Sequence, residues 1–176
     1  MVKQFSDLSA ADVQAYLSRG WLTHDGMWLF NAYNSVGIEK ANELNRAAIR
    51  SMAFLEMKRT RKILEYEERP SDIHELEHFI KEALGLLLPP DLCESFTLAV
   101  TGPSAIRWQW EKESCFAYKG IKRINMLDQY KCGVIYRIEC WLESFGFRHE
   151  VSPRIDGCLM KENGECGGEL IIKFSE

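Results

Sequence analysis

The first half of the chain carries apolar residues at the three- and four-residue spacing that is typical of amphipathic helices. Gly20, Gly37 and the Arg69-Pro70 pair are the positions where this pattern is expected to break. The pattern predicts helices over residues 9–20, 23 or 25 to 37, 38–44, 46–67 and 72–88. The inner face of the long fourth helix is predicted to contain Ile49, Met52, Ala53, Leu55 or Glu56, Thr60, Ile63 and Leu64.

The second half changes at Phe96 to an alternation of apolar and polar residues. Two such runs, residues 96–100 and 106–110, enclose a Thr-Gly-Pro-Ser turn and predict an antiparallel strand pair. Further along, the pattern predicts helices at 114–125 and 132–145, strands at 147–151 and 169–174, and a loop at 152–168. The expected fold is α+β, with helices of residues 1–90 packed on a ββααββ antiparallel-sheet unit of residues 91–176 in one compact domain.

Length and composition are those of a globular protein. The chain has 176 residues, 46% of them hydrophobic, and a net charge of −4 that draws it to neither nucleic acid nor anionic membrane. The longest apolar run, Leu84–Leu88, is far shorter than the roughly 20 residues that span a bilayer, and the N-terminus lacks the pattern of a signal peptide. We therefore expect a cytoplasmic protein with no nucleic-acid or membrane partner, and a homodimer stays open as one oligomeric state.

Three polar motifs suggest functions that their surroundings do not favour. The segment His74–His78 matches the H-E-x-x-H pattern of zinc proteases, but both histidines point away from the apolar stripe centred on Ile80 and should face solvent. The basic run Lys58–Lys62 is expected to be a solvated face balanced by neighbouring glutamates rather than a nucleic-acid site. Asp25 is expected to cap a helix while His24 packs on an aromatic neighbour, with proton chemistry by this pair as the alternative.

Cysteines are the main chemical signal, because five of the six lie in the last third of the chain. In a reducing cytosol they serve as ligands, nucleophiles or core residues rather than as disulfides. Cys158 and Cys166 flank a turn-rich loop, and Cys132 opens a predicted helix whose exposed N–H groups favour a thiolate. These three thiols predict a zinc site. A cysteine nucleophile paired with His149 or His24 is an alternative, and three unrelated buried thiols are another.

The aromatic residues suggest a ligand pocket. Trp108 and Trp110 share one face of a predicted strand with Ile106, opposite the helix that carries Tyr136. Ordinary core packing accounts for such a face, and the functional alternative is the wall of an apolar cavity. We expect a small apolar or aromatic ligand in a cavity of a few hundred Å³ bounded by Trp108, Trp110 and Tyr136.

Two segments near the N-terminus resemble a known signature. Asp25-Gly26-Met27-Trp28, followed by Val36–Ala41, resembles an uncharacterised family of small prokaryotic cytosolic proteins. That family is itself similar to the L-2-amino-thiazoline-4-carboxylic acid hydrolase-like proteins.

The last 80 or so residues are similar to the vinyl-reductase-type ligand-binding domain, a fold shared by nitric-oxide signalling and Golgi-transport proteins. The similarity lies in the ββααββ order, in Tyr130-Lys131-Cys132-Gly133 and in the spacing of Cys158 and Cys166. It implies zinc held beside an apolar pocket by three cysteines and a glutamate, as in phenol-binding and other sensors of that group. Cys132, Cys158 and Cys166 match the cysteines, but Ile155 stands where the glutamate is expected, so Asp156 or Glu150 would substitute. Other candidates for the fourth ligand are His149, Cys140 and Cys115.

These observations predict a small-molecule-binding or sensor-like module with a structural zinc at Cys132, Cys158, Cys166 and Asp156. A hydrolase of amide-like or thiazoline-like bonds, using a cysteine or a metal-bound water, is the alternative. A helical interaction protein that holds zinc is a third. The coordination shell distinguishes them, because a structural zinc is closed by protein ligands and a catalytic one keeps an open position. No catalytic residue is assigned.

Overall fold

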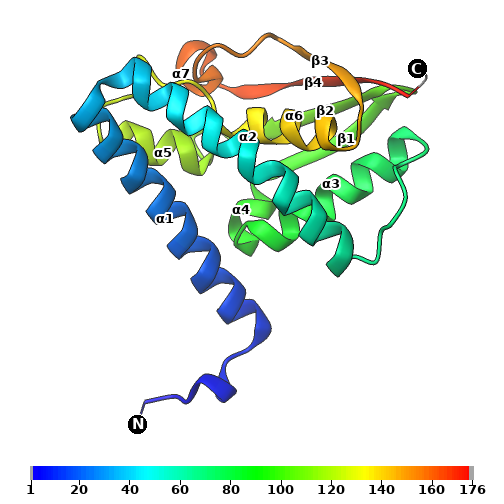
Figure 1. Ribbon diagram of the computed structural model, residues 1–176, viewed down its shortest axis with the longest axis horizontal. Coiled ribbons are helices and arrows are strands. Elements are labelled where there is room, and N and C mark those ends of the chain that lie inside the picture. Colours follow the sequence, from blue (N-terminus) through cyan, green and yellow to red (C-terminus); the bar gives the residue numbers. More distant parts are fainter. Residues whose placement is uncertain (1, 175–176) are drawn as a thin grey trace.

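The computed structural model describes residues 2–174 and has the predicted α+β fold (Figure 1). Its four strands form one antiparallel sheet in the order β1-β2-β4-β3. The strands are β1 (Phe96–Gly102), β2 (Ala105–Trp110), β3 (Arg148–Ser152) and β4 (Cys166–Lys173). The strands form two pairs along the chain with α5 and α6 between them, as predicted, but a short helix also lies between β3 and β4, so the observed order is ββααβαβ.

Helices cover one face of the sheet and leave the other toward solvent, as is common for antiparallel sheets. On β2 the side chains of Ile106, Trp108 and Trp110 are buried, while Arg107 between them is exposed. Trp108 pairs with Gly168 of β4, and a Cβ atom at Gly168 would lie 2.4 Å from the indole ring. Glycine at 168 therefore lets the large ring lie flat over the neighbouring strand.

The N-terminal half is a pair of long helices, α1 (Ala10–Val36) and α2 (Ile38–Ile63), joined at Gly37. Ser9 caps α1: its side chain accepts a hydrogen bond from the Asp12 N–H, and the Asp12 side chain accepts one from the Ser9 N–H. The predicted breaks at Gly20 and between 44 and 46 were wrong. Glycine in a helix interior costs about 1 kcal/mol relative to alanine, which tertiary packing of such a long helix offsets. Asp25 accordingly lies inside α1 and caps nothing, whereas His24 stacks on Trp21 as expected.

The buried face of α2 agrees with the expected one at Ile49, Ala53 and Thr60, and of the two alternatives Leu55 and Glu56 it is Glu56 that is buried. Leu55 and Ile63 are instead 50% and 67% exposed. The reason is that Glu56 finds donors on α6, so its burial is compensated by hydrogen bonds. Glu56 therefore does not balance the basic run on the helix surface, where Lys58 and Lys62 are exposed.

The third helix of the N-terminal half is α3 (Ile73–Leu87), which Asp72 caps. Helix α4 (Pro90–Glu94) is a short helix that the sequence did not predict. Three further helices accompany the sheet: α5 (Phe116–Arg123), α6 (Val134–Ser144) and α7 (Leu159–Asn163). Helix α6 lies between α2 and the sheet, which places it at the centre of the molecule (Figure 1). Helix α7 lies in the segment 152–168 that was expected to be a loop, and β4 begins at Cys166 rather than 169.

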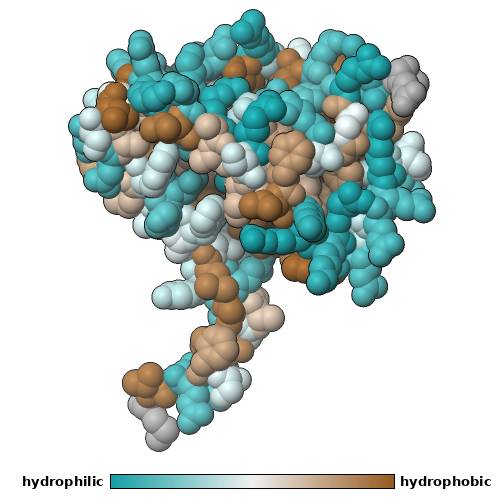
Figure 2. Space-filling model, in the orientation of Figure 1, coloured by the Kyte–Doolittle hydropathy of each residue, from teal (hydrophilic) through white to brown (hydrophobic). Residues whose placement is uncertain are grey.

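The N-terminal part of α1 projects from the body of the molecule (Figure 1). Figure 2 shows brown, apolar side chains along this projection. Among them Tyr16 and Leu17 are 80% and 62% exposed. The C-terminal part of α1 returns to the body, where Leu29 is buried. Only this second part contributes to the core.

Candidate functional site

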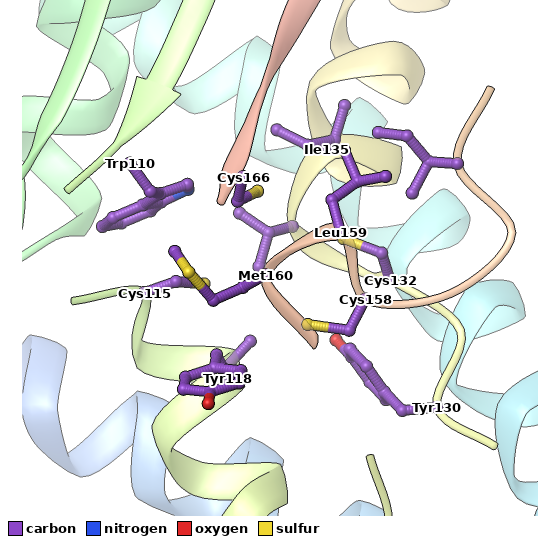
Figure 3. A pocket seen from close by; sticks show the side chains of 13 residues that line it. Trp110, Cys115, Tyr118, Tyr130, Cys132, Ile135, Cys158, Leu159, Met160 and Cys166 are labelled. Atoms are coloured by element: carbon purple, nitrogen blue, oxygen red, sulfur yellow. The ribbon is translucent and has the colours of Figure 1, made fainter. Parts of the chain in front are cut away.

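Four of the cysteines line one small pocket (Figure 3). They are Cys115, Cys132, Cys158 and Cys166, which come from four separate segments of the chain. The structure thus brings together the three predicted cysteines and adds Cys115. The other two, Cys93 and Cys140, do not line this pocket.

Local structure explains how each thiol reaches the pocket. Cys115 is the residue before α5, Cys158 is the residue before α7, and Cys132 lies two residues before α6. All three therefore lie close to helix N-termini, where backbone N–H groups lack partners. Cys166 is the first residue of β4 and pairs with Trp110 of β2.

The pocket is very small and mostly apolar. Its volume of about 20 Å³ is enough for one water-sized particle. Besides the thiols it is lined by apolar side chains such as Ile155 and Met160, and by Tyr130. An ordered water needs two to four polar partners, which thiols supply poorly.

Burial raises the pKa of all four thiols, to about 12 for Cys115 and Cys166. Backbone N–H groups at the following helix starts lower the pKa of Cys115, Cys132 and Cys158 in part. Negative charge on Cys132 would raise the pKa of Cys115 and Cys166 further. The thiols are therefore protonated at neutral pH unless a cation joins them, which disfavours a cysteine nucleophile.

Two buried indole groups beside β4 also lack an acceptor. Trp108 Nε1 and Trp110 Nε1 have no hydrogen-bond partner among the described residues. Trp110 is the strand neighbour of Cys166, and the Trp108 indole lowers the pKa of that thiol. An N–H group left without an acceptor costs free energy, and an anionic sulfur is a good acceptor. The Trp108 indole therefore offsets only part of the effect of burial, and the pKa of Cys166 stays raised.

The expected fourth ligands other than cysteines lie elsewhere. Asp156 is exposed and pairs with Arg154 at 3.7 Å, and Glu150 is exposed and pairs with Lys173 at 2.7 Å. His149 lies 3.6 Å from Glu139 of α6. Within residues 2–174, no three His, Cys, Asp or Glu side chains already stand in an arrangement that could hold a metal ion. The four thiols share a cavity without having converged on one point.

A second, larger cavity of about 550 Å³ adjoins the thiol pocket. It lies among α1, α2, α3, α5 and α6. Both cavities are lined by Trp110, Ala117, Tyr130 and Val134, so these residues form a shared wall. Of the three aromatic residues predicted to line a ligand pocket, Trp110 does so.

The other two predicted aromatics lie outside the larger cavity. Trp108 is fully buried in the core. The Tyr136 ring lies 3.8 Å from the Arg46 guanidinium, and its hydroxyl accepts from Arg50. The prediction placed the cavity on the sheet, whereas helices form most of its walls. Sequence reasoning therefore missed Asn45 and Arg137, which line it from α2 and α6.

Comparison with known proteins places the chain in a family. A model described as a family of unknown function, DUF6125, matches residues 3–159. The chain belongs to this family. The DUF6125 match includes Cys115, Cys132 and Cys158 and ends before Cys166. No curated protein and no solved structure matches the chain significantly. These comparisons do not show the resemblance to thiazoline hydrolase-like proteins or to vinyl-reductase-type domains.

The remaining motifs of this DUF6125 protein stay on its surface. His74 and His78 are both exposed on α3, on the side away from the buried Leu76 and Ile80, as predicted. Because both histidines face solvent, they do not line the kind of cleft in which a zinc protease binds its metal. None of the helices in residues 2–174 combines the length and apolar character that crossing a bilayer requires.

Proposed function

We propose that this protein is a small-molecule-binding domain whose C-terminal segments are held together by one structural zinc ion. The zinc ligands would be Cys115, Cys132, Cys158 and Cys166, with Cys115 in the place expected for Asp156. The observation that carries the proposal is the thiol pocket itself: four cysteines from distant segments line a cavity of about 20 Å³, and this cavity shares a wall with one of about 550 Å³.

The residues present fit zinc by their chemistry. Four thiolates are a common ligand set for structural zinc. The two indole N–H groups without partners, at Trp108 and Trp110, are donors of the kind that stabilise metal-bound sulfur. A cysteine has a single side-chain torsion, and a change between staggered rotamers moves its sulfur by about 3 Å. The proposal requires such rotations, because the four thiols have not converged on one point in the described residues.

The zinc would act on structure rather than on a substrate. It would replace the protons of four thiols whose pKa is raised by burial, and it would neutralise the thiolate charges that repel each other. Four protein ligands leave no position for a catalytic water. This closed zinc shell weakens the hydrolase alternative. The raised pKa values of the thiols weaken it further, because they disfavour a cysteine nucleophile.

The larger cavity supports the binding function. Ligand cavities in proteins commonly measure about 300–1,000 Å³ and have mostly apolar walls with a few polar groups. The cavity of about 550 Å³ has this size and composition.

Metal content measured on protein purified without added metal is the direct test. We expect about one zinc per chain, and substantial loss of zinc in each of the variants Cys115→Ala, Cys132→Ala, Cys158→Ala and Cys166→Ala. Cys93→Ala and Cys140→Ala are matched controls, since these thiols lie outside the pocket, and both should keep the metal. Cobalt substitution would report sulfur ligation through its thiolate charge-transfer absorption.

Two results would contradict the zinc assignment. One is metal-free protein that binds no added zinc. The other is full zinc content in Cys115→Ala combined with loss in Asp156→Ala, which would return the fourth position to the carboxylate.

A further inference from the structure

One wall of the larger cavity is polar, and its hydrogen-bonding groups are unused. Asn45 of α2 is 5% exposed and makes no side-chain hydrogen bond to any residue that the structure describes. Asn42, one turn earlier, shows what a satisfied buried asparagine looks like. Its amide donates to the Gln129 carbonyl at 2.7 Å and accepts from the Lys131 N–H at 3.1 Å. Asn45 lines the cavity, so its amide can form hydrogen bonds with a group that the cavity receives.

Two further donors lie on the same wall. The Tyr130 hydroxyl accepts from the Gly133 N–H at 3.0 Å, and its own hydrogen has no acceptor within residues 2–174. A Cβ atom at Gly133 would lie 3.4 Å from both Asn45 Nδ2 and Tyr130 Oη, which places these two polar atoms at one corner. Arg137 follows Gly133 by one turn of α6, so it lies on the same face of the helix.

Arg137 keeps most of its donors free. Its Nη1 donates to Glu56 at 2.9 Å, and this is the only hydrogen bond that the described residues make with the guanidinium. A guanidinium group has five N–H donors and binds carboxylates with two of them at once. The Arg137 side chain is 18% exposed and lines the cavity, so its remaining donors are partly shielded from bulk water.

The other walls are apolar, and the charges around the cavity are mainly positive. The apolar walls include Leu29, Leu88, Leu92, Ile121, Ile138 and Trp141. Four basic side chains line the cavity, Arg19, Lys119, Arg123 and Arg137, against two acidic ones, Asp25 and Asp91. Arg19 pairs with Asp91 at 2.7 Å and Arg137 with the buried Glu56 at 2.9 Å, so Lys119 and Arg123 are the lining cations left against Asp25. This small positive excess favours an anionic ligand through electrostatic attraction.

We propose that the larger cavity binds an amphipathic organic carboxylate. The carboxylate accepts hydrogen bonds from Asn45, Tyr130 and Arg137, and the apolar body lies along α1, α3 and α5. This assignment rests on the proposed binding function and names its ligand class. A carboxylate suits the wall because every unused group there except the Asn45 carbonyl is a donor.

Calorimetric titration of the full, zinc-loaded chain tests the ligand class with two probes that share one apolar body. The probes are decanoate and its neutral counterpart decanol. Decanoate should bind more tightly than decanol to the wild type. Asn45→Leu and Arg137→Lys should each weaken decanoate binding by about tenfold or more, because each removes hydrogen bonds to a charged group. The affinity for decanol should stay within about twofold, because it draws mainly on the apolar walls.

Lys119→Gln is the matched control, since Lys119 is an exposed cation of the same cavity. It should change decanoate affinity by less than about threefold and only at low salt. Equal or tighter binding of decanol to the wild type would overturn the carboxylate assignment and leave the proposed binding function standing. Failure of both probes to bind would overturn the assignment together with the binding function. If Asn45→Leu fails to fold, Arg137→Lys, which retains the charge near Glu56, decides the question alone.

Discussion

The buried ion pair between α2 and α6 allows a quantitative test of the fold. Glu56 accepts from Arg137 at 2.9 Å and from the Trp141 indole at 3.0 Å. Arg137→Met would leave a carboxylate that is 5% exposed with one donor. Breaking a buried pair costs 3–5 kcal/mol, and we expect about 3 kcal/mol because the Arg137 side chain is 18% exposed and the pair is not fully desolvated. Glu56→Leu should cost about 2 kcal/mol, since it leaves the Trp141 N–H unpaired and lets Arg137 turn toward water.

The double variant Glu56→Leu/Arg137→Met decides whether the two side chains act as a pair. It removes both charges and leaves only the Trp141 N–H without a partner, so we expect a loss of about 2 kcal/mol rather than the sum of about 5. Urea unfolding with unchanged slope, followed by tryptophan fluorescence, measures all three variants. The exposed pair Arg50–Glu143 also joins α2 to α6 and is the control, with an expected coupling below about 1 kcal/mol. A coupling below about 0.5 kcal/mol at Glu56 and Arg137 would refute the reasoning.

Two more predictions concern stability. The Glu139 side chain raises the pKa of His149 above its ordinary value of 6.5. The pair therefore stabilises the fold fully below about pH 6.5, and this stabilisation is lost as the pH rises through the pKa of His149 in the folded protein. The difference in urea midpoint between wild type and Glu139→Gln should shrink across that range, and a difference independent of pH would contradict the pairing. Gly20→Ala should stabilise by about 0.5–1 kcal/mol, since nothing lies within 4 Å of the new methyl group. Gly37→Ala should destabilise by about 1–3 kcal/mol, because the backbone at Gly37 has φ 79° and ψ 167°. Thermal unfolding measures both glycine variants. If the unfolding temperatures of both variants shift in the same direction, one of these two backbone arguments is wrong.

Sequence patterns predicted the element order because short-range periodicity specifies it. The alternation at residues 96–100 and 106–110 led to the observed strand pair, in which Phe96 is opposite Trp110. The helix boundaries at Gly20 and Asp25 were wrong because both residues are tolerated in a long helix that tertiary contacts hold in place. Only Gly37, with its positive φ, is a true boundary of α1.

The thiol pocket was predicted in part, because three of its cysteines lie near predicted loop and helix ends. Cys115 was one of several alternatives, since its contact with Cys132 and Cys166 depends on how α5 packs, which no local pattern encodes. Asn45 was missed as a buried polar residue, and Glu56 was only one of two alternatives on the inner face of its helix, for the same reason. Their partners or neighbours, Arg137 and Tyr130, are more than 80 residues away in the chain.

The arrangement of the two cavities has a thermodynamic consequence. A zinc ion at the thiols would fix Cys166, whose strand partner is Trp110, and Cys132, two residues from Tyr130. Trp110 and Tyr130 belong to the wall that both cavities share. A carboxylate ligand that needs this wall in place would therefore bind more tightly to the metal-loaded protein. Coupling between two binding equilibria is reciprocal, so the same ligand would also raise the affinity of the protein for zinc. To the extent that the ligand stabilises the zinc-bound protein, it would slow the loss of zinc to a chelator. Under this argument the metal serves function by ordering the wall on which the ligand head group is held, without touching the ligand.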